Sequence, residues 1–357
     1  MIKNSINSAS ILKTVLDARK ISFLKFVCLF TVFIFFMLAI SVQAISAQNP
    51  ESSLFTDLTK TMGFITGQNY TLNFIKTEYP NLALQVQIAE SEFETSFGDA
   101  VENIDGLLLE TFGEEYTEFF KMMEKEVSSS IFPQQFTQEV AANFIAASEL
   151  IARGEIPSPV LETLLTYQFI DWPMEEFTLG YNRIFRTKNH PKAKDVDFQI
   201  RYPISWRPEE GERPNIIQKF TSENGRGLEG INLMVKDMPL PSDYTITEQD
   251  IEDLFAEEEI LKEMVPEGGK FISAKPIVLD KHKGAMIVFD YVAQQLDINI
   301  TSRILLLITI YNGKMIFINC SVSALPGEES KLEERFNLFE PLFKIIANTF
   351  IIQEQYK

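Results

Sequence analysis

Histidine and cysteine are scarce in this chain. Its 357 residues include two histidines, His190 and His282, and two cysteines, Cys28 and Cys320. A Ser-His-Asp triad or an imidazole-based metal site would need one of these histidines, and both fall in predicted loops. Residues 1–189 contain no histidine, which excludes a di-iron carboxylate site of the Glu-x-x-His kind from the first half. His190, which precedes a proline in a basic connector, is expected to be an exposed loop residue.

Internal disulfides are not expected. Cys28 lies inside a predicted export signal, so the mature chain would keep one thiol. Cys320 lies in the apolar run 316–322, which favours a small buried core residue over a nucleophile.

Several sequence motifs of catalysis are missing as well. The chain has no Gly-x-Ser-x-Gly, no phosphate-binding Gly-Lys-Ser/Thr loop and no His-Glu-x-x-His. Carboxylate pairs of the kind that hydrolyse glycosides need only two positioned acids, so sequence motifs cannot exclude them. An acid-residue hydrolase with a cleft between the two halves of the chain therefore stays open as an alternative. Two facing carboxylates of raised pKa in a deep pocket would favour it.

Basic charge is in short supply, because 32 Lys and Arg face 50 Asp and Glu, a net charge of −18. This sign argues against nucleic acid as a partner. Residues 1–47 carry five basic residues and one acidic residue, residues 48–185 carry six and 22, and residues 186–357 carry 21 and 27. The acidic excess thus belongs to the first half of the mature chain. It predicts a solvated surface or, alternatively, a patch for a basic or metal-loaded partner.

The N-terminus has the parts of a secretory signal. Basic residues precede an apolar run at 26–40, and small residues follow at 41–47. We expect a signal peptide over residues 1–47, cleaved after Ala44 or Ala47, and an exported, periplasmic or secreted bacterial protein. The alternative is an uncleaved membrane anchor over residues 26–44.

Residues 48–185 show helical periodicity and are predicted to form a helical domain. Leu82, Val86, Ala89 and Phe93 fall on one helical face. A further segment opens at residues 107–109, a helix starts near Pro133 and ends before Arg153-Gly154, and a short helix covers 160–167. The glutamates of the middle segment are expected to form a wet face; they are Glu114, Glu115, Glu118, Glu124 and Glu126.

Alternating apolar residues begin after the connector. Residues 177–185 are predicted to be one irregular strand. A strand then opens at residue 196 and ends at Pro203, and Trp206 folds back onto its apolar face. After a polar loop at 207–214, strands are predicted at 216–221, 231–235, 271–279, 285–293, 298–310 and 314–322.

Two helices complete this half. Thr245-Ile-Thr-Glu248 is a capping-box pattern for the first helix, and the last helix runs over residues 332–346, where Pro341 is expected to kink or split it. Asn312-Gly313 predicts a type I′ hairpin turn. The last four strands must be antiparallel because their loops are too short for crossovers. The expected fold class is α+β: a helical bundle, then an antiparallel sheet over residues 196–357 with two helices covering one face.

Tyr202-Pro203-x-x-Trp206 and this order of elements resemble the PsbP/Mog1/DcrB group. Residues 214–220 and 231–235 also resemble the group's second and third strands. The resemblance covers residues 196–352 and implies an antiparallel sheet flanked by helices. It also implies assembly, stabilising or binding proteins without shared catalytic residues. A photosystem role would need a photosynthetic context that the sequence does not show.

The sequence therefore predicts an exported, non-catalytic envelope protein that binds or stabilises another periplasmic or membrane component. Its partner would be a protein of the cell envelope, with contact to the membrane only if the signal is uncleaved. No catalytic, metal or cofactor residue is assigned. Trp206 is expected in the core. The arginines Arg201, Arg207 and Arg213 are expected to be solvated, with an anion site at the rim as the alternative.

Overall fold

The chain forms two compact units, which divide between Gln168 and Phe169. The computed structural model describes residues 50–131, 136–238, 246–295 and 298–356. The part before the division is the helical unit and the part after it is the sheet unit. The predicted signal, with both cleavage positions and Cys28, lies outside the described residues. Among the helices that the structure describes, none has the length and hydropathy needed to span a membrane.

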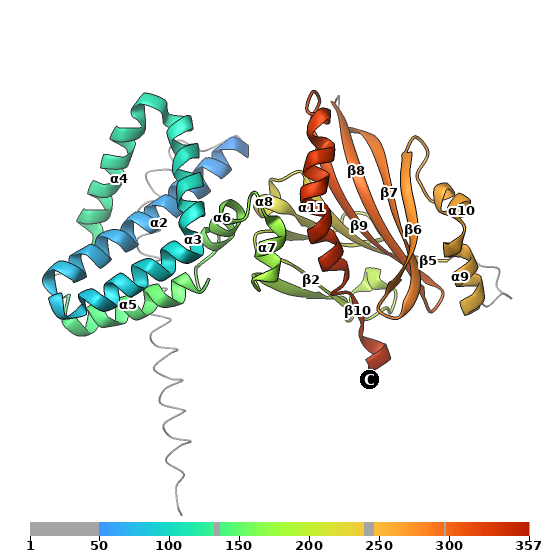
Figure 1. The fold of residues 1–357 in the computed structure, drawn as a ribbon, viewed down its shortest axis with the longest axis horizontal. Helices are drawn as coiled ribbons and strands as arrows, with labels where there is room; N and C mark the ends of the chain where they lie inside the picture. Colours follow the sequence, from blue (N-terminus) through green and yellow to red (C-terminus); the bar gives the residue numbers. More distant parts are fainter. Residues whose placement is uncertain (1–49, 132–135, 239–245, 296–297, 357) are drawn as a thin grey trace, which may run out of the picture. The chain divides into compact units, whose positions relative to one another are not determined.

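Long helices build the helical unit (Figure 1). They are α2 (Pro50–Glu78), α3 (Ala83–Phe112), α4 (Tyr116–Ile131), α5 (Gln138–Ala152) and α6 (Val160–Gln168), with the short 3-10 turns η1 (Pro80–Leu82) and η2 (Gly113–Glu115) between them. The helix α2 contacts α3, α4, α5 and α6, so most of its middle is buried.

Most helix predictions for this unit are confirmed. Val86, Ala89 and Phe93 form a buried face of α3, and Thr137 caps α5 by accepting a hydrogen bond from the amide of Val140. The predicted start near Pro133 lies outside the described residues. The separate helix expected from residue 107 is wrong, because α3 continues to Phe112. The predicted wet face is present: its glutamates are exposed except for Glu126, which is half-buried.

The sheet unit contains a seven-stranded antiparallel sheet in the order β3-β4-β5-β9-β8-β7-β6. Its strands are β3 (Arg207–Glu210), β4 (Ile216–Thr221), β5 (Glu229–Asp237), β6 (Lys270–Leu279), β7 (His282–Gln295), β8 (Ile298–Tyr311) and β9 (Lys314–Ala324). A second, three-stranded antiparallel sheet has the order β1-β2-β10, with β1 (Asn182–Arg186), β2 (Phe198–Pro203) and β10 (Ile351–Ile352).

The large sheet is buried on both faces. On one face, Val288 and Leu305 pack with α11 (Leu332–Ala347) and with β2. On the other face, the neighbouring residues Ile287 and Leu306 pack with α9 (Glu248–Ala256) and α10 (Glu258–Glu263). The helix α11 therefore lies on one face of the sheet, and α9 and α10 lie on the other (Figure 1). The prediction that both covering helices lie on the same face is wrong. The run 285–289 is apolar at every position, which is the pattern of a strand with two buried faces.

Local signals place several elements correctly. Asn312 and Gly313 both have positive φ, 48° and 68°, as a type I′ turn between β8 and β9 requires. The capping box exists two residues later than predicted, because Thr247 and Asp250 form it. The helix α11 passes through Pro341 as one helix, so the expected split is wrong.

Three short elements differ from the prediction. Residues 177–185 do not form one strand, because α7 (Pro173–Thr178) precedes β1. The predicted polar loop at 207–214 begins with the edge strand β3, and β10 follows α11. The predicted fold class, helices followed by an antiparallel sheet flanked by helices, is nevertheless confirmed.

Candidate functional site

The Pro-x-x-Trp turn occupies one end of β2 inside the sheet unit. The amide of Trp206 donates to the carbonyl of Pro203 over 3.2 Å, which closes the turn. Trp206 is 3% exposed, and its ring centre lies 6.3 Å from that of Phe339 and 6.4 Å from that of Phe343, both on α11. The predicted core position of Trp206 is confirmed.

A buried carboxylate of α7 holds this turn. Glu176 accepts hydrogen bonds from the backbone amide of Ser205 over 2.8 Å and from its hydroxyl over 2.6 Å. Burial raises the pKa of Glu176 to about 7, and the hydrogen bonds from Ser205 only partly oppose that shift. The group is therefore close to half-protonated near neutral pH.

The other side of Ser205 meets a left-handed turn. The carbonyl of Ser205 accepts from the amide of Asn224 over 2.8 Å. Glu223, Asn224 and Gly225 have φ values of 52°, 51° and 91°, a run that L-residues rarely adopt. A side chain at position 225 would also collide with the guanidinium of Arg207 at 2.3 Å. Gly225 is thus favoured by its backbone conformation, whereas the end of the exposed Arg207 side chain can move aside.

The same turn leads into a second buried acid. Glu229 accepts from the hydroxyl of Ser222 over 2.6 Å and from the Nε of Arg335 on α11. Arg335 also lies 3.6 Å from Glu223. The pKa of Glu223 is raised, mainly by burial and then by the charge of Glu229. We call the whole set the buried acid network; its members are Glu176, Ser205, Ser222, Glu223, Asn224, Glu229 and Arg335.

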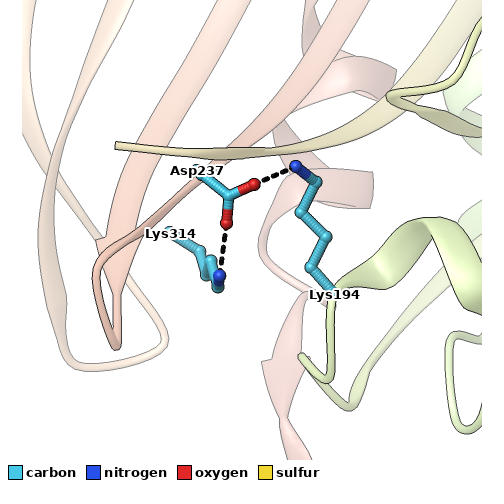
Figure 2. Close-up of polar contacts among 3 residues, drawn as sticks. All are labelled: Lys194, Asp237 and Lys314. Carbon is cyan, nitrogen blue, oxygen red and sulfur yellow. Dashed lines mark hydrogen bonds and ion pairs between the residues drawn. The ribbon is translucent and has the colours of Figure 1, made fainter. Parts of the chain in front are cut away.

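Two further groups of charged side chains in the sheet unit form ion pairs with one another. Arg303 of β8 binds both carboxylate oxygens of Asp290 on β7, over 2.8 and 3.1 Å. Figure 2 shows Asp237, at the end of β5, with one carboxylate oxygen directed at Lys194 and the other at Lys314. The two lysines lower the pKa of Asp237 to about 2.

The buried acid network includes the two carboxyls of raised pKa that an acid hydrolase would need. The carboxylate oxygens of Glu176, however, accept hydrogen bonds from Ser205, and the carboxylate of Glu223 lies near the guanidinium of Arg335. The Glu176 carboxyl thus supports the Pro-x-x-Trp turn, and the Glu223 carboxyl pairs with a side chain of α11. Within the part of the chain that the structure describes, no group of three or more His, Cys, Asp or Glu is placed to hold a metal ion.

The histidines and Cys320 have structural surroundings. His190 is half-buried rather than fully exposed, and its Nδ1 accepts from the amide of Lys192 over 3.2 Å. His282 begins β7 and is not a loop residue; its ring lies edge-on to Tyr311 at 5.2 Å. Cys320 is buried in the core, as predicted, and burial raises the pKa of its thiol.

The three arginines considered for an anion site have separate surroundings. Arg201 donates to the side chain of Asn182 over 2.8 Å, and Arg207 lies 2.8 Å from Glu209. Arg213 is exposed.

Exposed apolar side chains gather in sequence around α7. We call them the α7 residues; they are Ile170, Trp172, Met174, Leu179 and Ile184. Trp172 and Leu179 are each 67% exposed, although α7 buries Pro173 and Phe177 on its inner side. The edge strand β1 follows directly. Sequence analysis missed these residues, because apolar side chains near a turn do not reveal which of them will be covered.

A groove is present in the helical unit. It has a volume of about 680 Å³ and is formed by one face of α3 and the C-terminal end of α5. The residues lining it are Leu84, Gln87, Ile88, Ser91, Glu92, Thr95, Ser96, Ala152 and Arg153.

Comparison with known proteins gives similarity in structure alone. No family model matches the chain. No curated protein matches it either. Similar solved structures include cyanobacterial PsbP (CyanoP) from Synechocystis sp. PCC 6803, with 16% identity over 48% of this chain and 92% of that chain, at a TM-score of 0.29. The Ran-binding protein Mog1p of Saccharomyces cerevisiae has 9% identity over 48% and 95%, at a TM-score of 0.30.

A third structure is LpqN of Mycobacterium tuberculosis, which is involved in cell envelope biogenesis. It has 12% identity over 49% of this chain and 92% of that chain, at a TM-score of 0.28. The matches are consistent with a PsbP/Mog1-like region. Each of these matches covers about half of this chain.

Proposed function

We propose that the protein is an exported, non-catalytic envelope protein whose sheet unit binds a protein partner through the α7 residues. The observation that carries this proposal is the exposure of five large apolar side chains within residues 170–184. Exposed apolar groups that occur together are typical of interaction surfaces, and Trp is enriched at the energetic centres of such surfaces. Export is inferred from the sequence of residues 1–47 alone.

The buried acid network gives this surface a rigid base. Glu176 lies on the inner side of α7 and is bonded to Ser205, so the helix has one fixed position on the Pro-x-x-Trp turn. A rigid support lowers the entropic cost of binding. Glu176 therefore acts by positioning α7, and no reaction is assigned to the acids of the network.

A pull-down from envelope extracts tests the binding role. The wild type should retain a stoichiometric partner, and the double variant W172S/L179S should lose most of it. The matched control V278S/V292S removes two exposed apolar side chains of β6 and β7, which are 61% and 51% exposed, and should bind like the wild type. Recovery of no partner, or equal recovery by all three proteins, would contradict the proposal.

The intact mass of the protein purified from cell fractions tests export. We expect a periplasmic form that begins after Ala44 or Ala47. A full-length mass in the membrane fraction would instead indicate the uncleaved anchor, and a full-length mass in the cytoplasm would reject export.

A further inference from the structure

The groove of the helical unit has the shape of a helix-binding site. The residues that α3 contributes to it recur every three or four positions, from Leu84 to Ser96. This spacing keeps them on one side of the helix over about 18 Å, which is the length of about three helical turns. Ala152 and Arg153, at the end of α5, also line the groove. The volume of the groove, about 680 Å³, lies within the range of about 300–1,000 Å³ that is usual for binding clefts.

The chemistry of the lining is unusual for a solvated helix face. Leu84 is 68% exposed and Ile88 is 45% exposed, one helical turn apart. The opposite side of α3 already supplies Val86 and Ala89 to the core of this unit, so Leu84 and Ile88 are not needed there. The remaining positions include the short side chains of Ser91, Thr95 and Ser96, which let another backbone approach closely.

The net charge of the helical unit indicates which kind of partner the groove would bind. Residues 50–168 carry five Lys or Arg and nineteen Asp or Glu, a net charge of −14. One of these acids, Glu92, lines the groove itself, together with one basic residue, Arg153. A basic partner would be attracted by this surface, whereas a second copy of this chain or an anionic lipid surface would be repelled.

We propose that the groove between α3 and the end of α5 binds a basic amphipathic helix of a partner protein. Its apolar residues, spaced at i, i+3, i+4 and i+7, pack on Leu84 and Ile88, and a Lys or Arg residue faces Glu92. This site is separate from the α7 residues, so the inference stands or falls independently of the proposed function.

Binding of a synthetic 18-residue Lys/Leu amphipathic peptide to the purified full-length protein tests the proposal. A scrambled peptide of the same composition and a Glu/Leu peptide of the same pattern serve as probe controls. We expect the Lys/Leu peptide to bind at least tenfold more tightly than either control, and binding should weaken as salt rises.

Two double variants test whether the peptide binds in the groove. The double variant L84S/I88S should weaken binding of the Lys/Leu peptide at least tenfold. The control L109S/M122S removes two other exposed apolar side chains of the same unit, which are 50% and 70% exposed, and should leave binding unchanged. Circular dichroism confirms that both variants keep their helices.

Three results would overturn the proposal. One is equal binding of the ordered and scrambled peptides, which would indicate charge attraction alone. The second is equal affinity of the wild type and L84S/I88S. The third is a different occupant, seen as self-association of the wild type or as binding to anionic vesicles that L84S/I88S abolishes.

Discussion

The ionisation of Glu176 should be visible in the stability of the protein. Its pKa is about 7 in the folded state and 4.5 in the reference state. The folded protein therefore keeps a proton that the unfolded chain releases in this range. The free energy of unfolding should fall as pH rises from about 4.5 to about 7, by up to about 3 kcal/mol, and level off above that.

Replacing Glu176 with Gln should remove this dependence. The variant E176Q should gain stability relative to the wild type as pH rises from 5 to 8, measured by urea denaturation. E175Q changes an exposed carboxyl on the same helix and is the matched control. A stability difference between E176Q and the wild type that is the same at pH 5 and pH 8 would refute the assignment.

Arg335 compensates the buried charge of Glu229. The side chain of Glu229 is fully covered, whereas that of Arg335 is 41% exposed. Removing one partner of a buried ion pair typically costs about 3–5 kcal/mol, and solvent screening at Arg335 reduces the expected loss for R335M to about 2–3 kcal/mol. The double variant R335M/E229Q should recover most of it. If the double variant is as unstable as R335M, packing rather than charge explains the loss.

At the scale of elements, α11 contains a correctable defect. Pro341 is exposed in the middle of the helix, lacks an amide hydrogen and leaves the carbonyl of Asn337 without its usual helical donor. P341A should restore this hydrogen bond and stabilise the protein by about 1–3 kcal/mol. The exposed control N337A changes helix propensity alone. Equal effects of P341A and N337A in urea denaturation would contradict this account.

Elements with local signals could be predicted from the sequence, and those fixed by distant contacts could not. Asn312-Gly313 specifies its own turn, so the hairpin of β8 and β9 was predictable. The apolar run 285–289 contains a signal for a strand covered on two faces, although the period-2 pattern of the other strands predicts one covered face. The buried acid network had no such signal, because Glu176 and Ser205 are 29 residues apart and meet only after folding.

At the scale of the whole molecule, each unit has its own core. Leu72, Ile75 and Val86 belong to one cluster in the helical unit, whereas α11 and the large sheet share another in the sheet unit. Burial of apolar surface is the main favourable term in folding, so each unit has the means to fold cooperatively. We therefore expect two transitions when the full-length protein is heated in a calorimeter.

Two alanine substitutions should show which transition belongs to which unit. Ile75 and Leu342 are both fully buried, one in each core, and replacement of either by Ala should cost about 2–5 kcal/mol. I75A should lower the midpoint of one transition and L342A that of the other, because neither cluster includes the altered side chain of the other unit. E176Q should move only the transition that L342A moves. If I75A and L342A shift the same single transition, the two units unfold together, and the division at Gln168 has no thermodynamic counterpart.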